Sequence, residues 1–368
     1  MKISITRTEL TRALAIVSRG IAAHSTLPIL SCIHVLTADD SKVIFETTDL
    51  DTSIQCSVTA FIEEPGSVAV PGKLLGTIAK SLPDAAVLME TNHAGQLEIT
   101  CGGSTSLLNT PDATDFPSFP HLNPTQTVTL PVARIADMSD FVSRAISRDN
   151  HRVIMTGIYL SVHDNRLTLV STDSYRLALC EATLQQPVDE PFEVILPGYF
   201  FRDTMKNEAN NEEISLGVTE NQILMSFADS TYVTRRIEGD YPNYERLIPK
   251  SHKMSAVVDT SELVAGIRRA AVLAPPNASV KFLFSVEKQA IVISSKSQDV
   301  GEATESVSAE IEGEDIEIAF NYNYILDALV SMTTDKTIIE LEADKRPGVI
   351  RPTSSDRMLY LVMSVHLG

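Results

Sequence analysis

The sequence contains no tryptophan and only four cysteines, which are far apart and form no Cys-x-x-Cys pair. It therefore predicts neither a disulfide framework nor a zinc site, and Cys32, Cys56, Cys101 and Cys180 are expected to be buried free thiols. The eight histidines are scattered without the spacing of metal ligands. We expect no metal ion and no cofactor.

Long apolar segments are also missing. No stretch approaches the roughly 20 consecutive apolar residues that a membrane-spanning helix requires. The first ten residues alternate apolar with polar side chains and include Arg7 and Glu9, so they lack the apolar core of a secretory signal. We expect a cytoplasmic protein with no membrane partner.

Positive charge is in the minority. The 30 lysines and arginines are outnumbered by 48 aspartates and glutamates, which gives a formal net charge of -18. This balance argues against a nucleic-acid partner, unless the positive charge is concentrated on one surface.

The sequence does contain a threefold internal repeat, whose copies begin near Met1, Thr127 and Lys253. Each copy opens with a short strand and an amphipathic helix, followed by paired alternating runs that are typical of antiparallel hairpins. A second short helix and further alternating runs follow. The six expected helices span Thr8–Val17, Lys73–Leu82, Pro131–Ile146, Tyr199–Asn207, Thr260–Val272 and Tyr322–Met332.

Two proline-containing segments, residues 115–124 and 240–249, separate the copies. A chain of this length is also too long for one ordinary core. We predict an α+β fold of three modules, residues 1–124, 125–250 and 251–368, each with two helices on one face of antiparallel sheets.

The expected helices have an apolar face and a basic face. Leu10, Leu14, Val17 and Ile21 form the apolar stripe of the first helix, and Leu74 and Ile78 lie on the apolar side of the second. In the helix of the middle copy the stripe consists of Ile135, Met138, Val142 and Ile146.

Basic side chains point away from these stripes on five of the six helices, whereas the last helix has no lysine or arginine and contains Asp327. One such helix is an ordinary solvated surface, but five in an acidic protein favour contact with DNA phosphates without reading of bases. The basic residues are Arg12, Arg19, Lys73, Lys80, Arg134, Arg144, Arg148, Arg202, Lys206, Arg268 and Arg269.

An enzymatic alternative uses Asp49, Asp51 and Asp173 as metal-binding carboxylates of a nuclease. Equivalent segments, TTDLD, STDSY and SSKSQD, occur at the same place in each copy, and the third lacks the comparable acid. This distribution is typical of a turn at the end of a strand. Since the sequence also lacks a Walker loop, His-Glu-x-x-His and Gly-x-Ser-x-Gly, we expect no catalytic residues.

Six segments along the whole chain are together specific for one family. They are Thr26–Leu30, Thr48–Asp51, Asp115–Pro117, Ser171–Ala178, Glu238–Tyr244 and Tyr360–Leu367. With these segments, the chain resembles the beta subunit of bacterial DNA polymerase III, the sliding clamp.

The resemblance implies a non-catalytic processivity subunit. Two copies would form a head-to-tail homodimer whose six modules close a ring around double-stranded DNA, with helices lining the hole. It places the dimer interface around Leu108 on one side and Val272 and Leu273 on the other, and it adds His24, His151 and Arg152 to the DNA-facing residues.

The resemblance also implies a groove that binds linear motifs of the polymerase catalytic subunit, the clamp loader and repair proteins. Methionine and leucine suit an adaptable apolar pocket, and Arg176 and Arg246 are expected at its rim. The matching positions are Met155, Thr172, Ser174, Tyr175, Arg176, Leu177, Pro242, Arg246, Leu247, Val362, Met363, Ser364 and Val365.

Several positions depart from the family pattern. Ser174-Tyr175 replaces a common Gly-His pair, the tail reads Met-Ser-Val-His-Leu-Gly, and Val153-Ile154 replaces aromatic residues of some members. A second hypothesis keeps the groove without DNA: a repeat scaffold that recruits peptides but encircles nothing.

Overall fold

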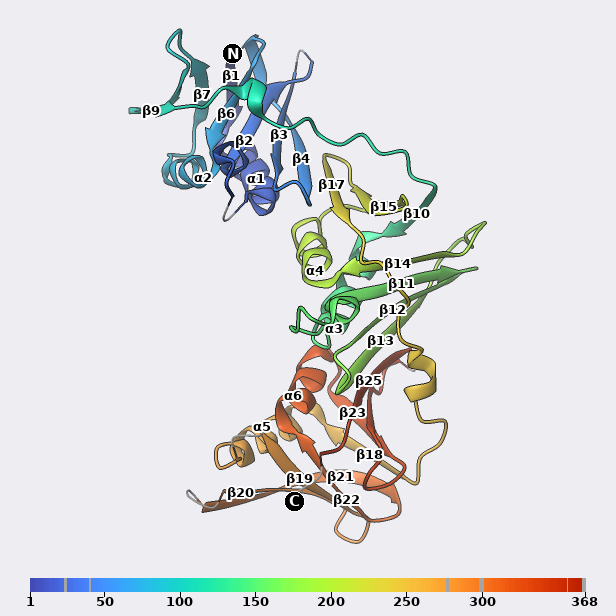
Figure 1. The fold of residues 1–368 in the computed structure, drawn as a ribbon. Coiled ribbons are helices and arrows are strands. Elements are labelled where there is room, and N and C mark those ends of the chain that lie inside the picture. Colours follow the sequence, from blue (N-terminus) through green and yellow to red (C-terminus); the bar gives the residue numbers. More distant parts are fainter. Residues whose placement is uncertain (23–24, 40, 276–277, 298–300, 356, 366–368) are drawn as a thin grey trace. The chain divides into compact units, whose positions relative to one another are not determined.

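The computed structural model describes residues 1–22, 25–39, 41–275, 278–297, 301–355 and 357–365. These residues form two compact units, Met1–Val132 with Asn207–Arg236, and Ala133–Lys206 with Ile237–Gly368. Figure 1 follows the chain through its helices and strands. None of the helices in the described part is long and apolar enough to cross a membrane.

The three copies of the repeat share one order of elements, except that the first has the additional short strand β5. The first contains β1 (Lys2–Thr6), α1 (Arg7–Val17), β2 (Cys32–Thr37), β3 (Lys42–Thr48), β4 (Ser53–Thr59), β5 (Phe61–Glu64), β6 (Ser67–Pro71), α2 (Gly72–Ser81), β7 (Ala86–Thr91), β8 (Gln96–Cys101) and β9 (Ser104–Asn109). The second contains β10 (Gln126–Pro131), α3 (Val132–Ser143), β11 (Gly157–His163), β12 (Arg166–Thr172), β13 (Arg176–Thr183), β14 (Phe192–Pro197), α4 (Gly198–Asn207), β15 (Glu213–Val218), β16 (Gln222–Ser226) and β17 (Ser230–Arg235).

The third copy contains β18 (Met254–Asp259), α5 (Thr260–Ala271), β19 (Ser279–Ser285), β20 (Ala290–Ser297), β21 (Gly301–Gly313), β22 (Ile316–Asn321), α6 (Tyr322–Ser331), β23 (Lys336–Leu341), β24 (Gly348–Pro352) and β25 (Met358–Val362). The prediction of an α+β fold with two helices per copy is confirmed. The chain also forms 3-10 turns at Ser18–Gly20, Val153–Thr156 and Tyr244–Leu247.

All strand pairs formed by the described residues are antiparallel. The first unit holds a sheet in the order β5-β1-β7-β8-β9 and another in the order β10-β15-β16-β17-β4-β3-β2-β6. The second unit holds one sheet in the order β14-β11-β12-β13-β25-β24-β23-β18-β21-β20-β19-β22. The predicted hairpins β2–β3, β11–β12 and β19–β20 are all present.

Strands of consecutive copies pair with each other, and we call these pairings repeat joints. In the first unit β4 pairs with β17, so that Ile54 lies opposite Tyr232. In the second unit β13 pairs with β25, so that Ala178 lies opposite Tyr360. Each repeat joint therefore makes one continuous sheet from two copies.

The same hydrogen bond holds a hairpin to a helix end in every copy. The hydroxyl groups of Thr47, Ser171 and Ser295 donate to the carbonyl oxygens of Val17, Val142 and Ala270, respectively. All three hydroxyl-bearing residues are buried. This bond fixes how the residues of the three copies correspond.

The first helix of the middle copy, α3, is shorter than the predicted span Pro131–Ile146. The Val142 carbonyl accepts the Ser171 hydroxyl and the Ala145 amide, and the Ile146 amide turns to Ser143 instead. The helix therefore ends at Ser143, and Arg144 and Arg148 follow it rather than lying on it. The predicted apolar stripe of this helix is nevertheless buried, from Ile135 to Ile146.

The second helix also differs from the prediction. Leu74 is 46% exposed, because Leu75 and Ala79 form the buried face instead. The expected stripe is displaced by one residue, an error of 100° around a helix axis. In the first helix Leu10, Leu14 and Val17 are buried as predicted, whereas Ile21 lies beyond the helix end and is half-buried.

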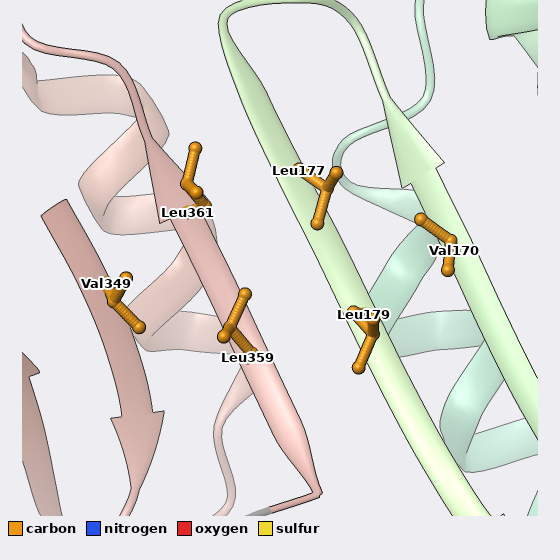
Figure 2. Close-up of a cluster of buried hydrophobic side chains, with 6 residues drawn as sticks. All are labelled: Val170, Leu177, Leu179, Val349, Leu359 and Leu361. Carbon is orange, nitrogen blue, oxygen red and sulfur yellow. The ribbon is translucent and has the colours of Figure 1, made fainter. Parts of the chain in front are cut away.

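A hydrophobic cluster lies at the repeat joint of the second unit. Figure 2 shows side chains of β12, β13, β25 and β24 on neighbouring strands. Tyr159, Tyr241, Tyr244 and Ile248 pack against it, so the segment that connects the second and third copies covers the strands. The buried members are Val170, Leu177, Leu179, Val349, Leu359 and Leu361.

Candidate protein-binding groove, DNA-facing residues and subunit interface

The residues predicted for the groove come from three segments of the second unit. The first runs from the 3-10 turn Val153–Thr156 to the start of β13, the second contains Pro242 and the 3-10 turn Tyr244–Leu247, and the third is the end of β25 with the residues after it. The Met363 amide donates to the Tyr175 carbonyl at 2.8 Å, which brings the third segment to the first. The Val365 amide donates to Ala319.

Burial divides these residues into two groups. Thr172, Leu177 and Val362 are buried in the sheet and support the surface from below. Tyr175 is 58% exposed, Leu247 49% and Met363 40%, so large apolar side chains face solvent in each segment. Ser174 and Arg246 are exposed, whereas Met155, Pro242, Ser364 and Val365 are half-buried.

Arg176 does not lie at the rim. Its side chain is 12% exposed, and its Nε donates to Asp173 at 3.0 Å. Nη1 donates to Asp327 and, at 3.2 Å, to the hydroxyl group of Tyr360. The guanidinium also lies 4.4 Å from the ring centre of Tyr324. Arg176 thus uses its donors inside the protein and connects β13 with α6 and β25.

An aromatic pair covers this network. The rings of Tyr175 and Tyr324 stack at 6.5 Å with an interplanar angle of 26°. The sequence did not identify Tyr324 or Asp327 as part of the site, because both lie on α6, about 150 residues from the turn at Tyr175. The absence of lysine and arginine from α6 was a sequence signal for this network. Asp327 of α6 pairs with Arg176 and lies 3.8 Å from Arg144.

The Ser174 hydroxyl connects the residues of the predicted groove with the loop after α3, which contains Arg152. It accepts from Arg152 at 3.1 Å and approaches the Met155 sulfur at 3.2 Å. Ser174 has a φ of 76°, a left-handed conformation in which glycine has no steric penalty. Arg152 also lies 3.8 Å from Asp149.

Two carboxylates of the nuclease alternative, those of Asp49 and Asp173, are used in turns, and that of Asp51 pairs with Arg235 at 2.9 Å. The Asp49 Oδ1 accepts the amides of Asp51 and Thr52, and the Asp173 Oδ1 accepts those of Tyr175 and Arg176. Leu50 repeats the left-handed conformation of Ser174, with a φ of 77°. Within the described residues, no group of histidine, cysteine, aspartate and glutamate could hold a metal ion.

The four cysteines are free and buried, as predicted. Burial raises the pKa of the Cys56 and Cys180 thiols to about 12, so both are protonated at neutral pH.

Many of the basic residues predicted to face DNA have acidic neighbours. Arg12 pairs with Glu9 at 2.9 Å and lies 3.6 Å from Asp229, and Lys206 pairs with Asp140 at 2.8 Å. Arg202 pairs with Asp203. Such pairs reduce the positive charge that these helices present.

Other basic residues are exposed. Lys73 and Lys80 lie on α2, Arg134 on α3, and Arg19 in the 3-10 turn after α1. Arg148, His151 and Arg152 follow α3 and are exposed as well. His24 lies outside the described residues.

The residues predicted for the dimer interface differ in exposure. Val272, just after α5, is 78% exposed, and Leu273 is half-buried. Leu108 is buried in its own sheet at 7%, whereas the neighbouring Leu107 is 53% exposed. No sequence pattern favours Leu107 over Leu108, because β9 carries leucine on both faces.

Repeated modules of two helices on antiparallel sheets, joined strand to strand, define the class of DNA clamps. The chain matches the DNA polymerase III beta subunit models for the N-terminal domain over residues 1–120, the central domain over 129–243 and the C-terminal domain over 245–366. The chain therefore belongs to the DNA polymerase III beta subunit family.

Similar proteins agree with this assignment. The beta sliding clamps of Synechocystis sp. and Bacillus subtilis are each 30% identical, with full or 99% coverage of both chains. The crystal structure of the Bacillus subtilis clamp matches with a TM-score of 0.93, 29% identity and full coverage of both chains. The Pseudomonas aeruginosa clamp bound to griselimycin matches with a TM-score of 0.94, 25% identity and full coverage.

The chain is accordingly a DNA sliding clamp for the replicative polymerase, a processivity subunit without catalytic activity of its own.

Replacing Arg176 by methionine should lower the free energy of unfolding by roughly 2–3 kcal/mol, because Asp173 and Asp327 then face each other without their shared cation. Urea unfolding followed by circular dichroism measures the change. Adding Asp327→Asn to the variant should recover part of the loss. A loss below about 0.5 kcal/mol would show that the network is not structural.

Proposed function

We propose that the three copies of the repeat, residues 1–124, 125–250 and 251–368, act as three modules of a ring that two chains close head to tail around duplex DNA. The exposed groove of the second unit binds linear motifs of the polymerase catalytic subunit, the clamp loader and repair proteins. A subunit of the DNA polymerase works where chromosomal DNA lies, so we place the protein in the cytoplasm. The observation that carries this proposal is the pattern of the repeat joints.

Two strand edges at positions equivalent to the repeat joints have no neighbour in the described structure. β4 and β13 pair with the last strand of the following copy, but β9, the last strand of the first copy, is an edge strand. In the third copy, residues 301–308 of β21 pair with β20 alone. Exposed edges of this kind are templates for pairing with another chain.

The register of the two repeat joints predicts how these edges meet. The strand pairings make Ser106 of β9 equivalent to Tyr232 and Tyr360. The hairpin-to-helix hydrogen bonds make Thr47, Ser171 and Ser295 equivalent. Their partners on the next strand, Ile54, Ala178 and Ala303, are therefore equivalent as well. Ser106 of one copy should therefore lie opposite Ala303 of another, in a third repeat joint between chains.

The exposure of Leu107 supports this third repeat joint. Its equivalents Val233 and Leu361 are 1% and 2% exposed, because each lies within a repeat joint, whereas Leu107 is 53% exposed. Pairing with β21 of a second chain would cover it as its equivalents are covered.

Leu107→Asp should therefore raise the dimer dissociation constant at least about tenfold, because pairing would bury an unpaired carboxylate. Sedimentation velocity over a concentration series measures it. Leu50→Asp is the matched control, because Leu50 is 59% exposed and lies outside both edges. A monomeric wild-type protein, or equal effects of the two variants, would contradict the proposed ring.

DNA would be held by topology, assisted by the exposed basic residues. After loading onto nicked circular DNA with the clamp loader, the protein should stay bound in high salt and leave when the circle is cut, whereas phosphate contacts alone would be lost in salt. Replacing Lys73, Lys80, Arg134 and Arg148 by glutamate should impair loading. The same change at Lys42, Lys288, Lys345 and Arg346, which are exposed outside the helices, is the control.

The second hypothesis, a peptide scaffold without DNA, predicts that both fourfold variants retain full function in replication assays. Equal activity of the wild type and the helix variant would therefore favour that scaffold.

We propose that griselimycin, which the Pseudomonas aeruginosa clamp binds, binds the groove of this chain. Leu247→Asp should weaken griselimycin binding at least about tenfold, because it places a charge in an apolar surface. Val330→Asp is the control, since Val330 is 48% exposed on α6 and is not among the proposed groove residues. Calorimetric titration distinguishes the two, and unchanged binding to Leu247→Asp would place the site elsewhere.

A further inference from the structure

The third copy contains a cavity between its two helices. α5 packs against α6, as Figure 1 shows, and a cavity of about 410 Å³ lies between the first turns of α5 and the end of α6. This volume is in the range of sites that bind small molecules or single side chains. Among the described residues that line the cavity, none belongs to the proposed groove or to the predicted subunit interface.

The repeat allows this cavity to be compared with the same place in the other two copies. The hairpin-to-helix hydrogen bonds align the first helices of the copies, so that Asp140 of α3 is equivalent to Arg268 of α5. The strand registers align the residues directly before the second helices. Lys80 of α2 and Lys206 of α4 are therefore equivalent to Val330 of α6.

Side chains cross this place in the first two copies. In the first copy, the Arg7 Nη2 donates to the Lys80 carbonyl oxygen at 3.2 Å and connects the start of α1 with the end of α2. In the second copy, Lys206 pairs with Asp140 at 2.8 Å and connects α4 with α3. The equivalent of Arg7 in the third copy is Thr260, a short and buried side chain that cannot cross the space.

The third copy also leaves charges unpaired around its cavity. Arg268 is exposed, and the equivalent of its partner position is Val330, which has no charge. The Thr260 amide donates to the Asp335 carbonyl at 2.8 Å, which places Asp335 beside the start of α5, close to Asp259. Among the described residues, neither Arg268 nor Asp335 has a partner in an ion pair or in a side-chain hydrogen bond.

The end of the cavity at the start of α5 is negatively charged. The Asp259 Oδ1 accepts the Glu262 amide at 2.9 Å and the Ser261 hydroxyl at 2.7 Å. These bonds lower the pKa of Asp259, so its carboxylate is ionised at neutral pH. The nearby Lys336 is paired with Glu310 at 3.1 Å. The cavity therefore has negative charge at one end and the free guanidinium at the other.

The space between the two charged ends is apolar. The apolar side chains that line it are those of Val264, Ala265, Leu329 and Val330. The hydroxyl groups of the lining threonines are already used, since Thr260 donates to the Thr334 carbonyl and Thr334 to the Lys336 carbonyl, both at 2.9 Å. A ligand that fits this cavity therefore has its polar groups at its two ends and an apolar body between them.

We propose that this cavity binds a primary ammonium group and a carboxylate at the two ends of one unbranched apolar chain. Asp259 and Asp335 bind the ammonium group, and Arg268 binds the carboxylate through two parallel hydrogen bonds. The methylene groups cover the apolar side chains between them. Arg268 follows Asp259 by nine residues, roughly 13 Å along the helix axis, and helical side chains lean toward the N-terminus, which shortens the gap.

Two kinds of ligand have this chemistry. One is a free ω-amino acid, and the other is a protein chain that ends in lysine, in which a four-carbon side chain carries the ammonium group close to the terminal carboxylate. Duplex DNA has neither an ammonium group nor an apolar chain. The proposal therefore assigns Arg268 a ligand other than the DNA phosphates predicted from the sequence.

Calorimetric titration of the full chain without DNA tests the ligand. 6-Aminohexanoate should bind at least about tenfold more tightly than hexanoate or hexylamine, because each of these lacks one charged end. A peptide that ends in lysine, compared with the same peptide amidated at its C-terminus, distinguishes the two sources. Binding of the free acid peptide supports a protein C-terminus as the ligand, and binding of 6-aminohexanoate alone supports a small molecule.

Two variants test the site. Arg268→Gln removes the charge and should weaken the binding of 6-aminohexanoate at least about tenfold. Arg268→Asp with Val330→Lys imitates the ion pair of Asp140 and Lys206 in the second copy, and it should abolish binding because the pair crosses the cavity. Arg346→Gln is the matched control, since Arg346 is exposed and does not line the cavity. Circular dichroism checks the folding of each variant.

Equal binding of hexanoate, hexylamine and 6-aminohexanoate would overturn the inference, as would a wild-type chain that binds neither 6-aminohexanoate nor the lysine peptide. Unchanged binding to Arg268→Gln would also overturn it, and this single variant is informative even if the double variant does not fold. A failure of the proposed ring is a separate result, because it appears in the sedimentation of Leu107→Asp and not in these titrations.

Discussion

An edge strand needs a partner for its main-chain amides and carbonyls, and the architecture of this protein depends on where those partners come from. β4 and β13 obtain theirs from β17 and β25 of the following copy. Each copy is therefore completed by its neighbour, which is the physical meaning of the repeat. The same requirement is unmet at β9 and the first part of β21 in the described structure.

The proposed groove depends on one of these repeat joints. Leu177 and Val362 support it from within paired strands, and Arg176 connects β13 to α6 and β25 beneath the exposed Tyr175. A surface that binds short motifs must keep apolar side chains exposed, and such exposure is stable only on a rigid base. Here the buried sheet of the second and third copies provides that base.

Much of the fold was predictable from the sequence, because alternating and helical patterns record which side chains must be buried. The six helices, the three hairpins and the buried stripe from Ile135 to Ile146 follow from that signal. The end of α3 could not be predicted in this way, because the hydrogen bond at its end comes from Ser171, almost 30 residues later.

The site was predictable in part. The family resemblance predicts the segments of the proposed groove, and the structure brings two of these segments together at Tyr175 and Met363. It could not show that Arg176 is internal, because that depends on Asp327 and Tyr324 of a distant helix. Net charge was a poor guide to exposed positive charge, because ion pairs such as Lys206–Asp140 are formed by residues far apart in the sequence.

The burial of all four cysteines has a practical consequence for chemical probing. Since the native thiols are enclosed, and two of them have strongly raised pKa values, alkylating reagents find little native reactivity on the surface of the folded chain. A cysteine introduced on an exposed strand edge can therefore be labelled or cross-linked selectively without first removing the natural ones. The buried thiols make the natural sequence a suitable background for testing in real time whether two chains assemble.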